Sequence, residues 1–390
     1  MIQGGKKKTI KKFIHDGNKY IIEQLENNYC VRKGKTYMCN KDVKTLTKQI
    51  RGGVPVELSN DTSEKNVKRI PYEERKKFLD NLEITSPNDF SPYFPIMQDK
   101  ETGTKFTLTK TLQQGSFGIA GLMASKETPP RQFVLKIFFD DPKYKEHRPA
   151  AILARDREIE VIDRLNKEGL LEESIYAKTI TYNKVNKYVL MELGQSDLFS
   201  FLELVYDNKL QLTPCDCVKI AYSIFKEVLY IFEKTGLLYS DIKLENFLYT
   251  HTPEDVLHIV MADYGSLADY DVTFGEGVTT TYIKVPPGAV QSRWVWKNNW
   301  DNVGFILGIV IIQLLGEYQE SADKISEYNT VMKIINHLPA KLLKNEKILL
   351  NALTQLKNEP DDLENIIKAF KNYEELTKCN LNNLPASIVA

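Results

Sequence analysis

Two short stretches of this chain of 390 residues carry its strongest chemical signal: LYSDIKLENFL at residues 238–248 and VMADYG at residues 260–265. They set out, in order, a carboxylate (Asp241), a lysine (Lys243), an amide (Asn246) and a second carboxylate (Asp263). A carboxylate can accept the proton of an attacking hydroxyl, and a lysine can meet a transferring phosphate. An amide and a second carboxylate can hold a divalent metal. The pattern therefore favours phosphoryl transfer over a set of unrelated polar loop residues.

A glycine loop, LQQGSFG at residues 112–118, lies between two predicted strands, Lys105–Leu112 and Gln132–Phe139. A dinucleotide-binding Rossmann loop opens a helix instead, so this placement disfavours that assignment. Glycines in a strand-turn-strand hairpin let backbone amides close over a polyphosphate. An ordinary hairpin turn is the alternative interpretation of the loop taken alone.

Lys136 lies inside a predicted strand that otherwise consists of Val, Leu, Ile and Phe. A lysine in such a strand is costly unless its ammonium group meets an anion. The predicted helix Arg148–Lys167 offers Glu158 as that partner. The alternative is a lysine on the solvent face of an edge strand.

The order and spacing of these segments resemble the eukaryotic-type protein kinase family over about residues 105–375. The resemblance implies an α+β fold with two lobes, a β-rich N-lobe and an α-helical C-lobe. It implies that Asp241 is the catalytic base, that Lys243 is catalytic through its contact with the phosphate, and that Asn246 and Asp263 bind the metal. The ATP-binding residues that it implies are Gln113, Gly115, Ser116, Phe117, Gly118, Lys136, Glu158, Met191, Glu192 and Leu193.

Within that set, Gly115 and Gly118 match the second and third glycines of the loop that covers the nucleotide. Lys136 matches the lysine that contacts the α- and β-phosphates, and Glu158 matches its partner on the following helix. Residues 191–193 resemble the gatekeeper and the hinge, whose main-chain groups would bind adenine.

Several positions depart from the family pattern. Gln113 replaces the first loop glycine. Ser240 replaces the arginine of the His-Arg-Asp triplet, and the loss of this arginine argues against control by loop phosphorylation. Tyr264 replaces the phenylalanine of the Asp-Phe-Gly motif and retains an aromatic ring at that position. Residues 286–288 (PPG) lack the glutamate of Ala-Pro-Glu, whereas Asp301 matches the aspartate that opens the buried helix of the C-lobe. Such simplifications resemble the divergent kinases of large DNA viruses.

The resemblance implies an ATP-dependent kinase that phosphorylates Ser or Thr in protein substrates with Mg²⁺, or with Mn²⁺ in its place. Lys243 follows the base as in the Ser/Thr-directed branch, and Thr281 aligns with a threonine that contacts the catalytic Asp and Lys in that branch. A pseudokinase or scaffold that binds nucleotide and partners without efficient turnover is the alternative, and a small-molecule kinase is less favoured. Inactive relatives typically lose one of four residues that are all present here: Lys136, Asp241, Asn246 and Asp263.

Charge is distributed unevenly along the chain although Lys plus Arg (52) equals Asp plus Glu (52). Residues 1–52 hold thirteen basic and four acidic residues, about +9, so the remainder carries about −9. This head has strand and turn signals typical of a hairpin or meander. Its charge suits an acidic partner, nucleic acid or the kinase-like lobes themselves, and a solvated or linker-like segment is the alternative. We expect the following division: a basic accessory module at 1–52, a linker at 53–87, the N-lobe at 88–193 and the C-lobe at 194–390.

Composition favours a soluble globular protein, since 42% of residues are hydrophobic and 27% are charged. The apolar run Val303–Leu315 is too short to span a bilayer and predicts a buried helix. We expect an intracellular protein, cytoplasmic or, for a viral chain, in the virion, because no secretory signal precedes the fold. Neither a disulfide framework nor a zinc site is expected from five unpatterned cysteines: Cys30, Cys39, Cys215, Cys217 and Cys379.

Overall fold

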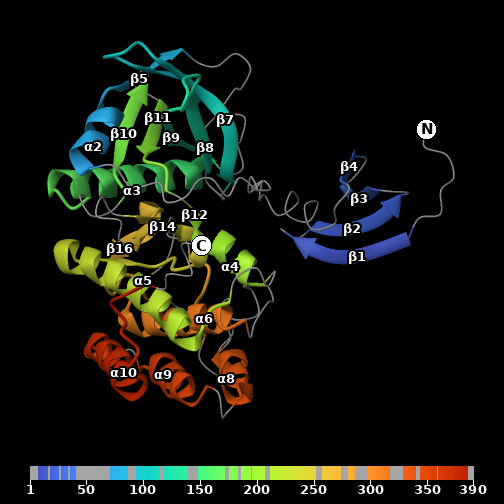
Figure 1. Cartoon of the computed structure of the whole chain (residues 1–390), viewed down its shortest axis with the longest axis vertical. Helices are drawn as coiled ribbons and strands as arrows, with labels where there is room; N and C mark the ends of the chain where they lie inside the picture. The colour runs from blue at the N-terminus through green and yellow to red at the C-terminus, as the bar shows by residue number, and fades with distance from the viewer. Residues whose placement is uncertain are drawn as a thin grey trace.

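The computed structural model describes residues 71–86, 94–114, 118–138, 148–171, 175–182, 186–194, 196–206, 211–251, 257–273, 280–285, 297–316, 328–339, 343–357 and 359–384, and the backbone of four strands within residues 8–40. Those four strands form an antiparallel sheet in the order β1-β2-β3-β4. The predicted meander at the basic head is therefore confirmed (Figure 1). The strands are β1 (Lys8–His15), β2 (Asn18–Leu25), β3 (Asn28–Lys33) and β4 (Thr36–Asn40).

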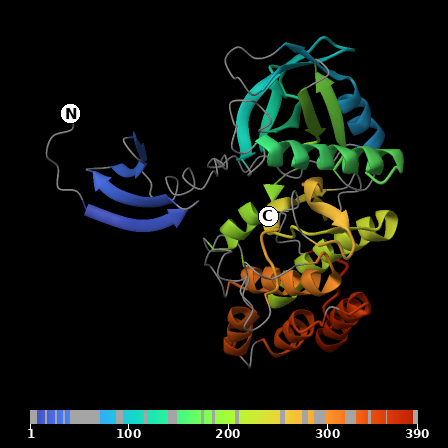
Figure 2. The same cartoon turned by 180° about the vertical axis from the view of Figure 1, so that it is seen from behind.

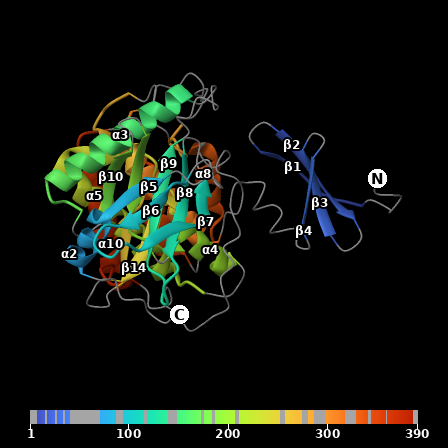
Figure 3. The same ribbon diagram turned by 90° about the horizontal axis from the view of Figure 1, so that it is seen from above.

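The N-lobe is a seven-stranded antiparallel sheet with one long helix beside it. The order across the sheet is β10-β11-β9-β8-β7-β6-β5. Seen from above, the strands lie side by side and α3 (Arg148–Lys167) runs along one side of them (Figure 3). Alternation sends Phe106, Met123 and Phe133 into the core, where each is fully buried. The strands are β5 (Leu82–Ser86), β6 (Ile96–Asp99), β7 (Lys105–Gln114), β8 (Gly118–Ser125), β9 (Gln132–Phe138), β10 (Ala177–Tyr182) and β11 (Asn186–Met191).

The N-lobe begins earlier than the sequence predicts. Helix α2 (Tyr72–Asp80) packs Phe78 against the rings of Phe106 and Phe133, with ring centroids 5.8 Å and 6.1 Å away. Strand β5 then forms the edge of the seven-stranded sheet. The predicted linker at 53–87 is therefore wrong from residue 71 onward, because an amphipathic helix and an edge strand lie there. Residues 53–70 lie outside the described part of the chain.

The C-lobe is mainly helical, and α5 and α6 cross its centre (Figure 2). Helix α5 begins as its sequence predicts, because Thr213 and Asp216 form a capping box around Pro214. It ends where Gly236 takes a left-handed φ of 72°, which glycine adopts without strain. The helices are α4 (Leu198–Tyr206), α5 (Pro214–Thr235), α6 (Trp300–Leu314), α8 (Tyr328–His337), α9 (Lys344–Thr354) and α10 (Asp362–Thr377).

Helix α6 is buried on nearly all sides, so the predicted buried helix is confirmed. A side chain at Gly304 would place Cβ 2.3 Å from Leu356 and 3.0 Å from the Leu353 carbonyl, so α6 and α9 need a glycine there. The helix starts at Trp300, and Asn299 caps it by accepting a hydrogen bond from Asn302 N. The prediction that Asp301 opens this helix is confirmed, since Asp301 lies in its first turn. None of the helices in the described ranges is long and apolar enough to cross a membrane.

Short strands connect the lobes and carry the polar loops between them. Strands β12, β14 and β15 form one small sheet, and β13 pairs with β16 in another. These pairs bring residues 237–239 beside residues 267–269 and residues 247–251 beside residues 257–261. Their bounds are β12 (Ser196–Asp197), β13 (Leu237–Tyr239), β14 (Phe247–His251), β15 (Leu257–Met261) and β16 (Leu267–Asp269).

A disulfide joins Cys215, at the start of α5, to Cys379, just after α10, with Cα atoms 6.0 Å apart. Among the cysteines that the structure describes, Cys217 is free and buried. The expectation of unpaired cysteines is therefore wrong for Cys215 and Cys379. Their separation of 164 residues hides the pair, since spacing along the chain says nothing about such a distant partner.

Reduction of this disulfide is expected to lower the free energy of unfolding by about 2–4 kcal/mol, because the bond closes a long loop in the unfolded chain. Thermal denaturation with and without dithiothreitol should then differ by at least roughly 4 °C. Cys379→Ser is the control, since dithiothreitol should not shift its midpoint further. An equal midpoint for the wild type in both conditions would contradict the bond.

Candidate active site between the lobes

Asp241 lies in the loop after β13, buried to 4% exposure, and three groups converge on its carboxylate. Oδ1 accepts a hydrogen bond from Thr281 N at 2.6 Å. Oδ2 accepts one from Asn246 Nδ2 at 3.0 Å and lies 2.8 Å from Lys243 Nζ. Burial lowers the pKa of Lys243, but the charge and hydrogen bond of Asp241, together with smaller effects of other carboxylates, raise the pKa above its ordinary value. The two predicted catalytic residues therefore form one charged unit.

Asn246 is oriented by contacts to its amide nitrogen. Besides Asp241 Oδ2, Nδ2 donates to the Asp241 carbonyl and to Tyr239 Oη, each at 2.9 Å. Tyr239 stands where the sequence motif has histidine, is fully buried, and packs edge-on against Phe247. Its hydroxyl thus takes part in fixing the plane of the amide, and the three bonds direct the amide oxygen away from Asp241.

The β14–β15 hairpin brings Asn246 and Asp263 to the same end of one ladder. Phe247 pairs with Met261, and Ala262 N donates to the Asn246 carbonyl at 2.9 Å. Asp263 is 36% exposed, and its Oδ1 accepts bonds from Gly265 N and from Lys136. An amide and a carboxylate supply the hard oxygen ligands that Mg²⁺ prefers when phosphate oxygens complete the shell. The donor chemistry of this pair therefore fits the metal that the sequence implies.

Lys136 joins both lobes through two carboxylates. Its Nζ lies 2.9 and 2.7 Å from the oxygens of Glu158, on α3, and 3.1 Å from Asp263 Oδ1. Burial alone would lower the pKa of Lys136. The negative charges of Asp263 and Glu158 together have the larger effect and raise the pKa, so the ammonium stays protonated. Lys136 also holds the pKa of Asp263 below its ordinary value, against the effect of burial. The predicted Lys136–Glu158 pair is present, and its alternative, a solvent-facing lysine, is wrong.

The segment after Asp263 is attached to the Asp241 loop at both of its ends. Ser240 Oγ donates to the Ser266 carbonyl at 2.7 Å, and Thr280 Oγ1 donates to the Ser240 carbonyl at 2.8 Å. The contact between Thr281 and Asp241 is made by the Thr281 backbone N–H. Sequence alignment alone expects a threonine here without showing which of its groups makes the contact.

Lys284 anchors the end of the same segment to the C-lobe. Its Nζ pairs with Asp301 and donates to the Leu356 carbonyl at 2.5 Å, while its backbone N donates to Asn302 Oδ1 at 3.0 Å. The side chains of Lys284 and Asp301 are 12% and 15% exposed, so the pair is largely shielded from solvent. Residues 286–288, which lack the family glutamate, lie outside the described ranges.

Residues predicted to bind nucleotide lie on strands and a helix of the N-lobe, and in the segment after β11, where the structure describes them. Met191 ends β11 and pairs with Val134 of β9, next to the exposed Leu193. Gly118 begins β8, where a Cβ would lie 2.3 Å from the Ile137 carbonyl, so only glycine fits. Gln113 pairs with Ala120 in the β7–β8 ladder. The other predicted loop residues, Gly115, Ser116 and Phe117, lie outside the described residues.

Comparison with known proteins agrees with this arrangement. Residues 106–379 match the protein kinase domain. The chain belongs to the protein kinase family. Over 195 residues it is 25% identical to the meiosis-specific serine/threonine-protein kinase mek1 of Schizosaccharomyces pombe (strain 972 / ATCC 24843). That match covers 48% of this chain and 38% of the relative, so the chain spans well under half the length of the curated relative that it matches.

Membership confirms the predicted α+β, two-lobed fold, and kinases of this family in general use ATP and a divalent metal ion. Two contacts that hold residues of the kinase site in place could not be predicted from the sequence. The contacts of Lys284 follow no recognisable sequence spacing, since its partners Asp301 and Leu356 are distant in sequence. Tyr239 is visible as a departure from the triplet, but its bond to Asn246 is not.

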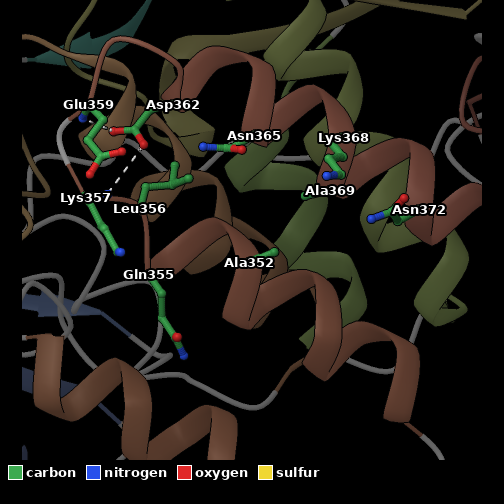
Figure 4. Close-up of a pocket in the computed structure, with 10 residues that line it drawn as sticks. All are labelled: Ala352, Gln355, Leu356, Lys357, Glu359, Asp362, Asn365, Lys368, Ala369 and Asn372. Atoms are coloured by element: carbon green, nitrogen blue, oxygen red, sulfur yellow. Dashed lines mark hydrogen bonds between the residues drawn. The ribbon is translucent and has the colours of Figure 1, made fainter.

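A hollow on the surface of the C-lobe lies away from this site. It measures about 330 Å³ and is formed by α9, α10 and the turn between them (Figure 4). The carboxylate of Asp362 there accepts bonds from the backbone N–H groups of Lys357 and Glu359. No predicted site residue lines it.

Lys136→Met is expected to destabilise the kinase by about 3–5 kcal/mol, because it leaves Glu158 buried at 2% exposure without its cation. The double variant Lys136→Met/Glu158→Gln should recover most of that loss, since Asp263 can still reach solvent. Urea unfolding of the wild type, the two single variants and the double variant gives the comparison. A double variant whose loss equals the sum of both single losses would show that the pair does not interact.

Proposed function

We propose that this chain is an active protein kinase that transfers the γ-phosphoryl group of ATP to Ser or Thr hydroxyls of protein substrates with Mg²⁺. The observation that carries the proposal is the state of Asp241. Its carboxylate is buried but held by Thr281, Asn246 and Lys243, with Lys136 and Glu158 paired within the N-lobe. Each group that phosphoryl transfer needs thus has a partner that holds it in position.

In this proposal Asp241 accepts the proton of the substrate hydroxyl as the hydroxyl oxygen attacks the γ-phosphorus, the bond from the γ-phosphorus to the β–γ bridging oxygen breaks, and ADP leaves. Lys243, 2.8 Å from that carboxylate, places a positive charge beside the transferring group. Lys136 contacts the α- and β-phosphates from the opposite side of the cleft, and Glu158 keeps its ammonium in place. The two ammonium groups stabilise negative charge on the phosphate oxygens, whereas Asp241 removes the proton from the attacking hydroxyl.

Asn246 and Asp263 would hold the Mg²⁺ ion, with Mn²⁺ as an alternative. The bound ion neutralises charge on the β- and γ-phosphates. The main chain of residues 191–193 would bind adenine, and residues 113–118 would cover the phosphates. Because both Glu192 side-chain oxygens accept bonds from the N-lobe, its contribution to the adenine site comes from main-chain atoms.

Two observations support Ser/Thr specificity. Lys243 follows the base by two residues, and the matched relative is named as a serine/threonine kinase. The proposal takes an active enzyme over a pseudokinase because Lys136, Asp241, Asn246 and Asp263 are all present. Phosphoamino-acid analysis of the labelled product distinguishes Ser and Thr from Tyr.

Asp241→Asn is expected to lower the rate of phosphoryl transfer by about 10²-fold or more, because the amide cannot accept the proton. Radiolabelled ATP with Mg²⁺ and a mixture of generic protein acceptors gives the measurement. Asp269→Asn, at an exposed aspartate on β16, is the matched control and should keep wild-type activity. Equal labelling by wild type and Asp241→Asn would remove Asp241 as the base. Nucleotide binding without labelling by the wild type would favour the pseudokinase.

We also propose that the basic head, residues 1–52, recruits substrates with acidic surfaces. Its charge of about +9 supports this, and its strands pair only among themselves in the sheets that the structure describes. Deletion of residues 1–52 should therefore raise the KM for casein, an acidic protein, at low salt, with a smaller effect at 300 mM NaCl.

Turnover of a short neutral peptide is the control for this deletion and should not change. Loss of peptide turnover would show that the head belongs to the catalytic fold. Competition by a short DNA oligonucleotide, with no effect on casein, would assign the head to nucleic acid instead.

A further inference from the structure

We propose that helix α2 braces the adenine-binding hinge and that Arg75 is the positioning residue in this brace. Helix α2 (Tyr72–Asp80) precedes the region that matches the protein kinase domain, residues 106–379. The inference rests on the proposed function, because it assigns nucleotide to the main chain of residues 191–193. It adds a segment outside the matched domain to the determinants of ATP affinity.

The brace is a buried ion pair between Arg75 and Glu192. Arg75 Nη1 donates to Glu192 Oε2, and the two side chains are 6% and 13% exposed. Glu192 Oε1 accepts a second bond from Tyr176 N at 3.2 Å, and Glu192 N donates to the Tyr176 carbonyl at 3.1 Å. The carboxylate and the main chain of Glu192 are thus held at three points, one of which belongs to α2.

Helix α2 is itself fixed to the sheet, so the contact at Arg75 has a rigid base. Tyr176 Oη donates to Asp80 Oδ1 at 3.0 Å, and Lys178 Nζ lies 3.3 Å from the same oxygen. At the other side of the helix, Phe78 packs on two core rings and Leu79 is 1% exposed. Tyr72 packs edge-on against the ring of Tyr176 at 5.8 Å.

The pair matters for nucleotide because a hinge that is already ordered loses less conformational freedom on binding. Without the guanidinium, the Glu192 carboxylate would lose the charge of Arg75 in a largely buried place, and it would move toward solvent. Its main chain, which forms one edge of the adenine site, would move with it. The predicted result is weaker ATP binding with little change in the chemical step.

Arg75→Met is the decisive variant, since methionine keeps part of the apolar stem and removes the charge. Arg131→Met is the matched control. Arg131 also pairs with a buried carboxylate of the N-lobe, Asp99 at 2.8 Å, and stacks on Phe78 of the same helix, but none of its described contacts is with the hinge. The Arg131→Met variant therefore shows how a loosened α2 affects ATP binding while the bond between Arg75 and Glu192 remains.

For Arg75→Met we expect the Kd of a fluorescent ATP analogue and the KM for ATP to rise about 5- to 10-fold. The kcat and the KM for peptide should change less than twofold. Arg131→Met should lower the thermal midpoint and leave the Kd within twofold of wild type. Arg75→Lys, which keeps the charge, should stay within about threefold. An unchanged Kd for folded Arg75→Met, or an equal rise for Arg131→Met, would overturn the proposal.

Glu192→Gln provides a second route if Arg75→Met does not fold, because glutamine retains an acceptor for Tyr176 N. It should weaken ATP binding in the same direction, and the double variant should be less than additive. Additive losses would overturn the brace. A wild type that binds ATP but does not label substrate refutes the proposed function alone, since the Kd comparison still holds. A wild type that binds no nucleotide refutes both.

Discussion

Lys136 is the charge on which the site depends. Its ammonium lies against Glu158 from α3 and Asp263 from the loop after β15, so one side chain joins three segments from two lobes. Burying these charges is costly unless all of them are paired. Movement of α3 away from the sheet would leave Glu158 without the charge of Lys136, and Lys136 with Asp263 alone. The position of α3 and the placement of the proposed metal-binding carboxylate are therefore coupled through a single ammonium group.

The loop that carries Asp241 is assembled by neutral hydrogen bonds where the family pattern has an arginine. Ser240 bonds to the Ser266 carbonyl at the start of the following segment and accepts from Thr280 near its end. Lys284 then fixes that end to Asp301. None of these contacts needs a phosphate group. The arrangement gives a physical reason why loss of the phosphate-sensing arginine is compatible with an ordered site.

Sequence patterns predicted the features that depend on residues close together in the chain. The Asp-x-Lys-x-x-Asn spacing identified Asp241 and its neighbours, and the Thr213-Pro214 opening and Gly236 predicted both ends of α5. Contacts between distant segments gave no signal, as at Arg75 and Glu192, which are 117 residues apart. The cap of α6 gave no signal either, because a helix cap depends on which side chain turns back to the backbone, and Asn299 does so.

The departures from the family pattern bear on whether the chain is a scaffold or an enzyme. Tyr239 replaces a histidine, yet its hydroxyl accepts a bond from Asn246, so the amide keeps a fixed orientation. Asp241 is buried at 4% exposure, and a buried carboxylate destabilises the fold unless donors surround it. A binding module gains nothing from such a group, because an apolar residue would pack there at lower cost. The partners of Asp241 and Asn246 thus favour an enzyme that uses both groups over a fold that only displays a surface.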